Sequence, residues 1–212
     1  MIPVKILAVR YLANASPALA EGLGAPKGYH CLGMLTTDSD DATYIALDAA
    51  TKAAEVTVCY GRSFYAGAAN ASTPNAGEVI GILAGATPGA VKSGMEAAVA
   101  ALNRVGFEEV HAVPYLAHTV SSVGSYLAKE AGVRQGSAIA YLIAPPLESM
   151  YALDAALKAA DVKLCKLYGP PSETNFGGAL LSGTQSACDA ACAAFAQAVA
   201  EVAGMPRQAT RD

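Results

Sequence analysis

Two stretches of the chain repeat one order of apolar and polar positions. Residues 47–59 read LDAATKAAEVTVC and residues 153–165 read LDAALKAADVKLC, so the second copy follows the first by half of the 212-residue chain. In each copy an Ala-rich helical pattern gives way, after an acidic residue and a Val, to a strand pattern that ends in Cys. A self-match at half the length predicts two copies of one fold.

Each copy also keeps an Asp and a Lys four positions apart. The pairs are Asp48 with Lys52 and Asp154 with Lys158. That spacing places both charges on one helix face, where we expect an ion pair worth about 0.2–0.5 kcal/mol.

The periodicity predicts the same order of elements in both halves: strand, short helix, strand, helix, strand, strand, helix. Strands are expected at residues 5–12, 31–37, 56–60, 79–84, 110–117, 138–144 and 178–181, with one more that ends at 167. Of the long helices, one ends at 55, others begin near 87 and 151, and the last carries Cys188, Cys192 and Phe195 on its inner face. This order predicts an α+β fold, with a small antiparallel or mixed sheet in each half backed by helices on one face. The predicted domains are residues 1–108 and 109–212.

Two segments without periodicity interrupt this scaffold. Residues 61–77 and 168–177 are rich in small and polar residues, and the first segment is eight residues longer than the second. Loops beyond about 12–15 residues are uncommon in compact domains and are often functional.

Composition narrows the classes of function. The chain is 53% hydrophobic and 15% charged, below the roughly 25% charged residues of an average domain. This favours burial of surface in subunit contacts over the alternative of a compact Ala-rich enzyme. A net charge of −4 argues against a nucleic-acid partner, which requires a basic patch. No apolar run reaches the ~18 residues of a membrane span.

Five cysteines at irregular spacing are typical of a reducing compartment. Cys188 and Cys192 share a helix face, and two small buried residues are favoured there over a metal site.

Acidic residues gather at residues 38–41, which read DSDD before a predicted helix. Acids at a helix start satisfy free N–H groups and the helix dipole, and this is one interpretation. The other is a cation site. The matched residues 145–148 read PPLE, so only one half carries the cluster.

Further candidate ligands lie in the two irregular segments. Glu78 and Glu173 each lie beside a bend, and Thr174 and Asn175 follow the second. Carboxylates beside hydroxyl and amide groups suit a small amine that carries an alcohol, although Asn175 could serve turn geometry alone. His118 has three possible interpretations: a ligand, a base, or a histidine at the surface. No nucleophile–base order and no phosphate-binding Gly motif is visible.

Several long strings resemble one known family. They are DSDDATYI at 38–45, YGRSFYAGAA at 60–69, AGEV at 76–79, APPLE at 144–148, PPSETN at 170–175 and the helix around Cys188 and Cys192. With these strings the chain resembles the L-type shell subunits of bacterial ethanolamine-utilisation microcompartments, over nearly its whole length. The resemblance implies two tandem, circularly permuted bacterial-microcompartment (BMC) domains.

The resemblance also implies an assembly and a pore. Three copies would form a pseudohexameric tile that joins other shell proteins edge to edge, in the shell of a microcompartment in the bacterial cytoplasm. A central pore for substrate or cofactor transport would be gated by loops. The gating residues would be Arg62, Ser63, Phe64, Tyr65, Gly67, Asn70, Gly169, Pro170, Pro171 and Ser172.

Ethanolamine is the ligand that the resemblance implies. Its ammonium would meet carboxylates, and its hydroxyl would meet backbone or Asn175. The implied site is Asp40, Asp41, Glu78, Phe107, Glu173, Thr174 and Asn175, with Phe107 in a segment that is shorter here than the family pattern. No catalytic residue, metal or required cofactor is implied, and cobalamin is at most a bound or transported ligand. The alternative is an amine-binding sensor or enzyme that uses Asp40, Asp41, Glu78 and Glu173.

Overall fold

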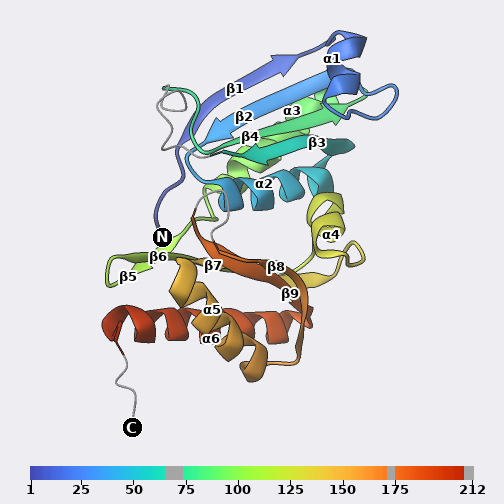
Figure 1. The fold of residues 1–212 in the computed structure, drawn as a ribbon. Coiled ribbons are helices and arrows are strands. Elements are labelled where there is room, and N and C mark those ends of the chain that lie inside the picture. The colour runs from blue at the N-terminus through green and yellow to red at the C-terminus, as the bar shows by residue number, and fades with distance from the viewer. Residues whose placement is uncertain (65–73, 171–174, 208–212) are drawn as a thin grey trace. The chain divides into compact units, whose positions relative to one another are not determined.

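A computed structural model describes residues 1–64, 74–170 and 175–207, and the chain in it divides into two compact units. The N-terminal unit is Pro3–Gly106 with Val123–Lys129. The C-terminal unit is Met1–Ile2, Phe107–Ser122 and Glu130–Asp212. Each unit is a sheet with helices packed on it (Figure 1).

The N-terminal unit has one antiparallel sheet of order β1-β2-β4-β3. Its strands are β1 (Ile6–Leu12), β2 (Cys31–Thr37), β3 (Val56–Ser63) and β4 (Val79–Gly85). Its helices are α1 (Pro17–Gly22), α2 (Asp40–Ala53), α3 (Pro88–Leu102) and most of α4 (Ser125–Ala131).

Glycines let both long helices approach this sheet closely. A Cβ on Gly33 of β2 would lie 2.8 Å from Val91 of α3, and one on Gly81 of β4 would lie 2.6 Å from Leu47 of α2. Both glycines are on the face that α2 and α3 cover. On the other face, Leu32 belongs to a smaller apolar cluster beside α1.

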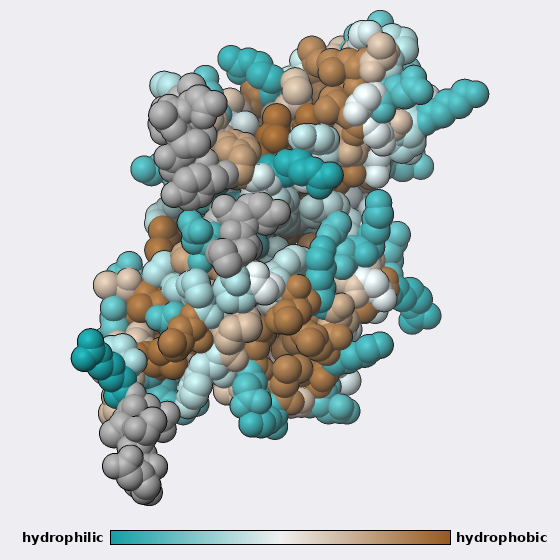
Figure 2. All heavy atoms as spheres, in the orientation of Figure 1, coloured by the Kyte–Doolittle hydropathy of each residue, from teal (hydrophilic) through white to brown (hydrophobic). Residues whose placement is uncertain are grey.

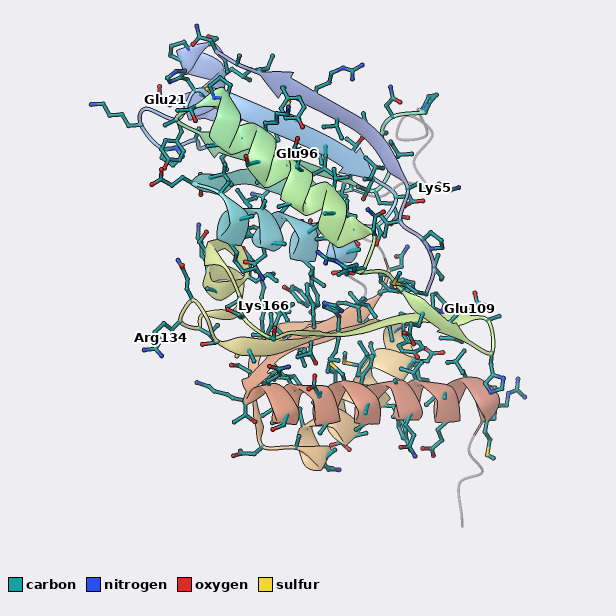
Figure 3. All side chains as sticks on the ribbon, turned by 180° about the vertical axis from the view of Figure 1, so that it is seen from behind. Lys5, Glu21, Glu96, Glu109, Arg134 and Lys166 are labelled. Atoms are coloured by element: carbon teal, nitrogen blue, oxygen red, sulfur yellow. The ribbon has the colours of Figure 1, made fainter. Side chains whose placement is uncertain are left out.

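The C-terminal unit has the strand order β5-β6-β7-β9-β8, again antiparallel. Its elements are β5 (Glu108–Val110), β6 (Val113–Val120), β7 (Ala138–Ala144), β8 (Val162–Tyr168), β9 (Gly177–Gly183), α5 (Pro146–Ala159) and α6 (Gln185–Gly204). Phe195, Cys188 and Cys192 of α6 lie in the core against β7 and β9. Charged side chains such as Glu96 on α3 and Glu109 on β5 lie at the surface of their units (Figure 3).

The α+β class is confirmed, and the predicted order of elements is confirmed except for one additional strand, β5, in the second half. All five cysteines are free thiols. Among residues 1–64, 74–170 and 175–207, no three His, Cys, Asp or Glu side chains are grouped so as to hold a metal. Within the same ranges, no helix has the length and apolar character needed to cross a membrane.

Three predicted boundaries were wrong. The strand expected at 110–117 is a hairpin, because His111 and Ala112 take φ of 49° and 62° and form a two-residue turn between β5 and β6. The helix expected from 151 begins at Pro146, where proline suits the first turn. Strand β3 continues past residue 60 to Ser63 because it stays paired with β4. The domain boundary between 108 and 109 stays a prediction.

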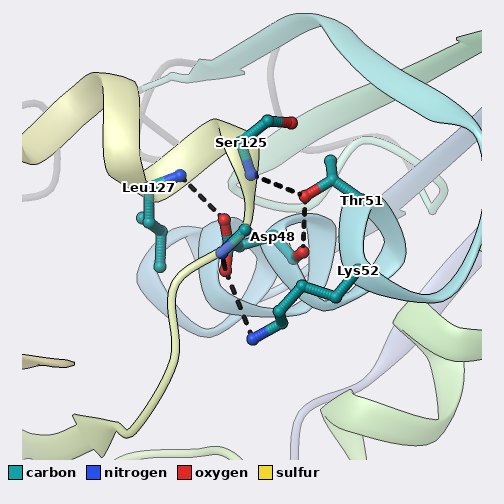
Figure 4. A network of polar contacts seen from close by, with 6 residues as sticks. Asp48, Thr51, Lys52, Ser125 and Leu127 are labelled. Carbon is teal, nitrogen blue, oxygen red and sulfur yellow. Dashed lines mark hydrogen bonds and ion pairs between the residues drawn. The ribbon is translucent and has the colours of Figure 1, made fainter. Parts of the chain in front are cut away.

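Helix α4 is bound to α2 by a buried carboxylate. Asp48 is fully buried, and its carboxylate accepts the N–H of Gly124 at 2.7 Å and of Leu127 at 2.8 Å. The Oγ1 of Thr51 accepts the N–H of Ser125 at 3.1 Å (Figure 4). The predicted ion pair with Lys52 is present at 3.4 Å. The predicted pair of Asp154 with Lys158 is also present, at 2.6 Å, but there the Asp154 side chain is 65% exposed.

Gly81→Ala should destabilise the N-terminal unit. The added methyl would overlap the buried side chain of Leu47, and overpacking of this kind costs about 1–3 kcal/mol. The free energy of unfolding from urea denaturation measures the loss. Gly89→Ala is the control, because a Cβ there meets nothing within 4 Å. Equal stability of both variants would contradict the close approach of α2 to β4.

Candidate functional site

The turn from β2 into α2 is shaped by threonine hydroxyls. The Oγ1 of Thr37 accepts the Ser39 N–H at 3.1 Å and lies 2.7 Å from the Oγ1 of Thr43. The Thr43 hydroxyl also lies 2.7 Å from the Ser39 carbonyl, to which it donates. Ser39 is the N-cap residue, but its own side chain makes no capping bond. The Thr37 and Thr43 hydroxyls therefore help to fix this turn.

Asp40 and Asp41 form the first turn of α2, and both are buried, with 7% of each exposed. The Asp41 N–H donates to the Asp40 carboxylate at 2.8 Å. Burial raises the pKa of Asp40, and bonds from the Asp41 N–H and from Ser63 oppose this rise. The carboxyl of Asp40 thus lies where a bound cation would lower its pKa toward the ordinary value.

Ser63, at the end of β3, links Asp40 to Tyr44. Tyr44 lies one turn after Asp40 on α2 and is hydrogen-bonded to Ser63. Burial, with the nearby charges of Asp40 and Asp41, raises the pKa of Tyr44 to about 12. The phenol therefore stays protonated and offers the site a neutral hydroxyl.

Glu78 joins this group through the backbone. Its N–H donates to the Thr37 carbonyl at 2.8 Å, and its carbonyl accepts the Phe64 N–H at 3.0 Å. Gly77 before it has φ of 64°, and a Cβ there would lie 2.0 Å from the Thr37 carbonyl oxygen, so only glycine fits. The pKa of Glu78 is raised by burial first and then by the charges of Asp40 and Asp38. The N-terminal unit thus brings Asp40, Asp41 and Glu78 into one electrostatic group.

The remaining predicted ligands belong to the C-terminal unit. The ring of Phe107 packs against that of Phe176, with centroids 5.8 Å apart. Asn175 takes a left-handed φ of 65°, which agrees with the turn interpretation. Glu173 and Thr174 lie outside the described residues.

The predicted gating residues also come from both units, and several of them lie outside the described ranges. Arg62 and Ser63 end strand β3, and the Arg62 guanidinium lies 5.7 Å from the Tyr60 ring centroid. Gly169 and Pro170 follow β8. The residues outside the described ranges are Tyr65, Gly67, Asn70, Pro171 and Ser172.

Sequence reasoning missed Tyr44 as part of the site. Its position four residues after Asp40 on a predicted helix was the available signal. Its bond to Ser63 depends on β3 reaching residue 63, which the sequence pattern did not predict.

Asp40→Asn should change how stability depends on pH. Because the folded-state pKa of Asp40 is raised, the folded protein binds its proton more tightly, and stability falls as pH rises from the unfolded pKa of about 3.9 through the folded value. The Asn variant should lose this dependence and be more stable than the parent at pH 7.

Urea denaturation between pH 4 and pH 8 measures this difference. Gly89→Ala is the control, because it removes no ionisable group and a Cβ there meets nothing within 4 Å, so its curve should be parallel to that of the parent. Parallel curves for parent and Asp40→Asn would contradict the raised pKa.

Comparison with known proteins gives consistent matches. The BMC domain family matches residues 31–116. The bacterial microcompartment shell protein EutL of Clostridium perfringens (strain 13 / Type A) is 57% identical over 210 residues, 97% of each chain. A monoclinic crystal structure of EutL from Clostridium perfringens superposes with a TM-score of 0.93 over 97% of this chain and 95% of that one. The crystal structure of ethanolamine utilization protein EutL from Leptotrichia buccalis C-1013-b gives 0.94 at 56% identity, over 98% of each chain.

Proposed function

This chain belongs to the EutL group of BMC-domain bacterial microcompartment shell proteins, and on that premise we propose that it is a structural subunit of an ethanolamine-utilisation microcompartment in the bacterial cytoplasm. The observation that carries the proposal is the 57% identity to a EutL shell protein over 97% of both chains.

In the proposed assembly, three copies form a pseudohexameric tile that joins other shell proteins edge to edge. The small charged fraction of 15% supports extensive subunit contact. Large apolar side chains are also exposed on the C-terminal unit, at Leu147, Tyr151, Leu164 and Leu167 among others, and brown surface gathers there in Figure 2. Isolated apolar residues are common on surfaces, but a group of this kind favours association.

Ethanolamine is the proposed ligand of the acidic group. At neutral pH it is an ammonium with one hydroxyl. Asp40 and Glu78 offer carboxylates whose burial makes charge unfavourable until a cation arrives, and the buried Asp41 lies beside Asp40. Tyr44 and Ser63 offer hydroxyls in the same place. Phe107, Glu173, Thr174 and Asn175 are proposed to supply the remaining contacts.

The proposed consequence of binding is control of a central pore. A ligand shifts a conformational equilibrium only by its differential affinity for the two states. Ser63 is the last residue of β3 and is itself one of the proposed gating residues, so a cation that changes its bond to Asp40 would act on the proposed gate. No cofactor is part of the proposal, and cobalamin enters only as a molecule that could be bound or transported.

Calorimetric titration tests whether ethanolamine binds to the acidic group. Ethanolamine should bind saturably to the wild type, and Glu78→Gln should weaken binding by about 10- to 100-fold, the effect of losing one charge-assisted bond. Because binding should ionise carboxyls whose pKa is raised, the enthalpy near pH 6 should depend on the ionisation enthalpy of the buffer.

Glu148→Gln is the matched control, since Glu148 lies in the first turn of α5 in the other unit. Unchanged affinity in Glu78→Gln would remove Glu78 from the site. Absence of saturable binding in the wild type would refute the proposal that ethanolamine is the ligand.

Light scattering and negative-stain microscopy test the assembly. A shell subunit should form trimers that associate into extended sheets as concentration rises. A discrete oligomer that turns over ethanolamine would instead support an enzyme built on the same acidic residues, and a discrete oligomer that only binds ethanolamine would support a sensor.

A further inference from the structure

The side chain of Tyr44 on α2 packs against β3 and α4 within the N-terminal unit. Its ring centroid lies 6.1 Å from that of Tyr126 on α4. A Cβ on Gly61 of β3 would lie 3.5 Å from the Tyr44 ring and 3.1 Å from the Tyr126 hydroxyl oxygen. Because Gly61 carries no side chain, both rings lie against the backbone of β3, close to its end at Ser63.

None of these three contact residues is kept at the matching position of the other repeat. Helices α2 and α5 both carry the string LDAA, strands β3 and β8 have a bulge at the same place, and left-handed glycines follow α1 and α4 at the same spacing. In this register the counterparts of Gly61, Tyr44 and Tyr126 are Leu167, Met150 and Ala18. The shared fold therefore does not require the glycine and the two tyrosines, and they meet beside the helix that carries the acids.

The Tyr44 oxygen is bonded to the free edge of the sheet. β3 is the edge strand in the order β1-β2-β4-β3. The Phe64 N–H donates to the carbonyl of Glu78, the residue before β4, at 3.0 Å. Successive N–H groups of a strand point to opposite sides, so the Ser63 N–H points to the free edge, where it donates to the Tyr44 oxygen. One acceptor position of the phenol is therefore used by the backbone.

Hydrogen-bond accounting fixes the direction of the remaining bonds. The Ser63 hydroxyl is bonded to both Asp40 and Tyr44, and it has one proton to donate. An ionised carboxylate only accepts, so the Ser63 O–H donates to Asp40 whenever Asp40 is ionised. The bond between the two hydroxyls then runs from the Tyr44 O–H to the Ser63 oxygen. The Tyr44 oxygen is left with one free lone pair and no free proton.

A bound ammonium creates this state, because an opposite charge nearby favours the ionised form of a carboxyl. Asp40 and Tyr44 are joined through the single hydroxyl of Ser63. Two O–H···O bonds span at most about 6 Å, so a molecule with an ammonium and a hydroxyl two carbons apart can reach both groups.

We infer that the Tyr44 oxygen accepts the hydroxyl proton of a small amino alcohol whose ammonium is bound by the acidic group. Tyr44 thereby makes the site prefer amino alcohols over amines that have no hydroxyl, and Tyr126 and Gly61 position its ring. The inference rests on the proposed binding of ethanolamine, and it names the residue and the feature of the ligand that set selectivity.

Calorimetric titration of the full-length wild type with three amines tests this inference. 2-Methoxyethylamine keeps the ligand oxygen but has no hydroxyl proton, and propylamine has a methyl group in place of the hydroxyl. Ethanolamine should bind about 3- to 10-fold more tightly than either, the effect of one neutral hydrogen bond. Equal affinity for ethanolamine and 2-methoxyethylamine would overturn the inference, because the ether oxygen can only accept.

Tyr44→Phe tests the residue itself. This variant keeps the ring beside Tyr126 and removes the acceptor, so the ratio of the ethanolamine and propylamine affinities should fall to about twofold or less. A general loss of affinity cancels in this ratio. Tyr29→Phe is the matched control and should keep the wild-type ratio, since Tyr29 packs against the smaller apolar cluster beside α1. An unchanged ratio in Tyr44→Phe would overturn the inference.

The outcomes separate this inference from the proposed ligand. A wild type that binds ethanolamine and propylamine equally overturns the role of Tyr44 and leaves ethanolamine as a ligand of the acids. A wild type that binds none of the three amines overturns both. Urea denaturation checks that Tyr44→Phe is folded, and if it is not, the comparison of the three amines on the wild type decides.

Discussion

The burial of Asp48 is the constraint on which the N-terminal unit depends. A carboxylate with no exposed surface is stable only when it is paired and hydrogen-bonded. Here two backbone N–H groups of α4 and the ammonium of Lys52 supply those partners. Removing the acceptor would leave the start of α4 unsatisfied, and removing α4 would leave a buried charge with one partner. The helix and the carboxylate therefore require each other, and this ties a segment of the second repeat into the unit formed by the first.

The pattern of Asp and Lys four positions apart occurs in both repeats, but its Asp is buried in the first repeat and exposed in the second. This difference shows what the sequence can predict and what it cannot. Spacing alone predicts the ion pairs of Asp48 with Lys52 and of Asp154 with Lys158, and both exist at 3.4 and 2.6 Å. Spacing does not show that one Asp is buried, because burial depends on α4, more than 70 residues later in the chain. Periodicity identifies which face of a helix can be covered, whereas the covering element is a property of the fold.

In the candidate site, too, some features could be predicted from local sequence and others depend on contacts that only the folded chain makes. The acids at residues 38–41 were visible as a cluster, and their two interpretations were a helix cap and a cation site. In the structure the Thr37 and Thr43 hydroxyls shape the turn, and the Asp40 carboxylate accepts the Asp41 N–H at the start of α2. The helix-cap interpretation therefore has a bond to support it, and the cation site stays a prediction. Tyr44 and Ser63 complete the group through bonds that depend on strand pairing. Such contacts cannot be predicted from local sequence, since β3 and α2 meet only after the sheet has formed.

Helix α2 carries both the buried Asp48 and the acidic group at its start. Asp40 lies at its start, Asp48 two turns later, and Tyr44 between them, with its ring 6.1 Å from that of Tyr126 on α4. The hold of α2 on α4 thus also positions the phenol that bonds to Ser63. Helices α2 and α5 begin at Asp40 and Pro146, so the predicted match of 38–41 with 145–148 was wrong by one residue. The counterparts of Asp40, Asp41 and Tyr44 are Pro146, Leu147 and Met150, which carry no charge. Both repeats keep the Asp of the ion pair, but only the first begins its helix with acidic side chains. The carboxylates on which the proposed ligand site depends are therefore carried by the first repeat alone, although both repeats share one fold.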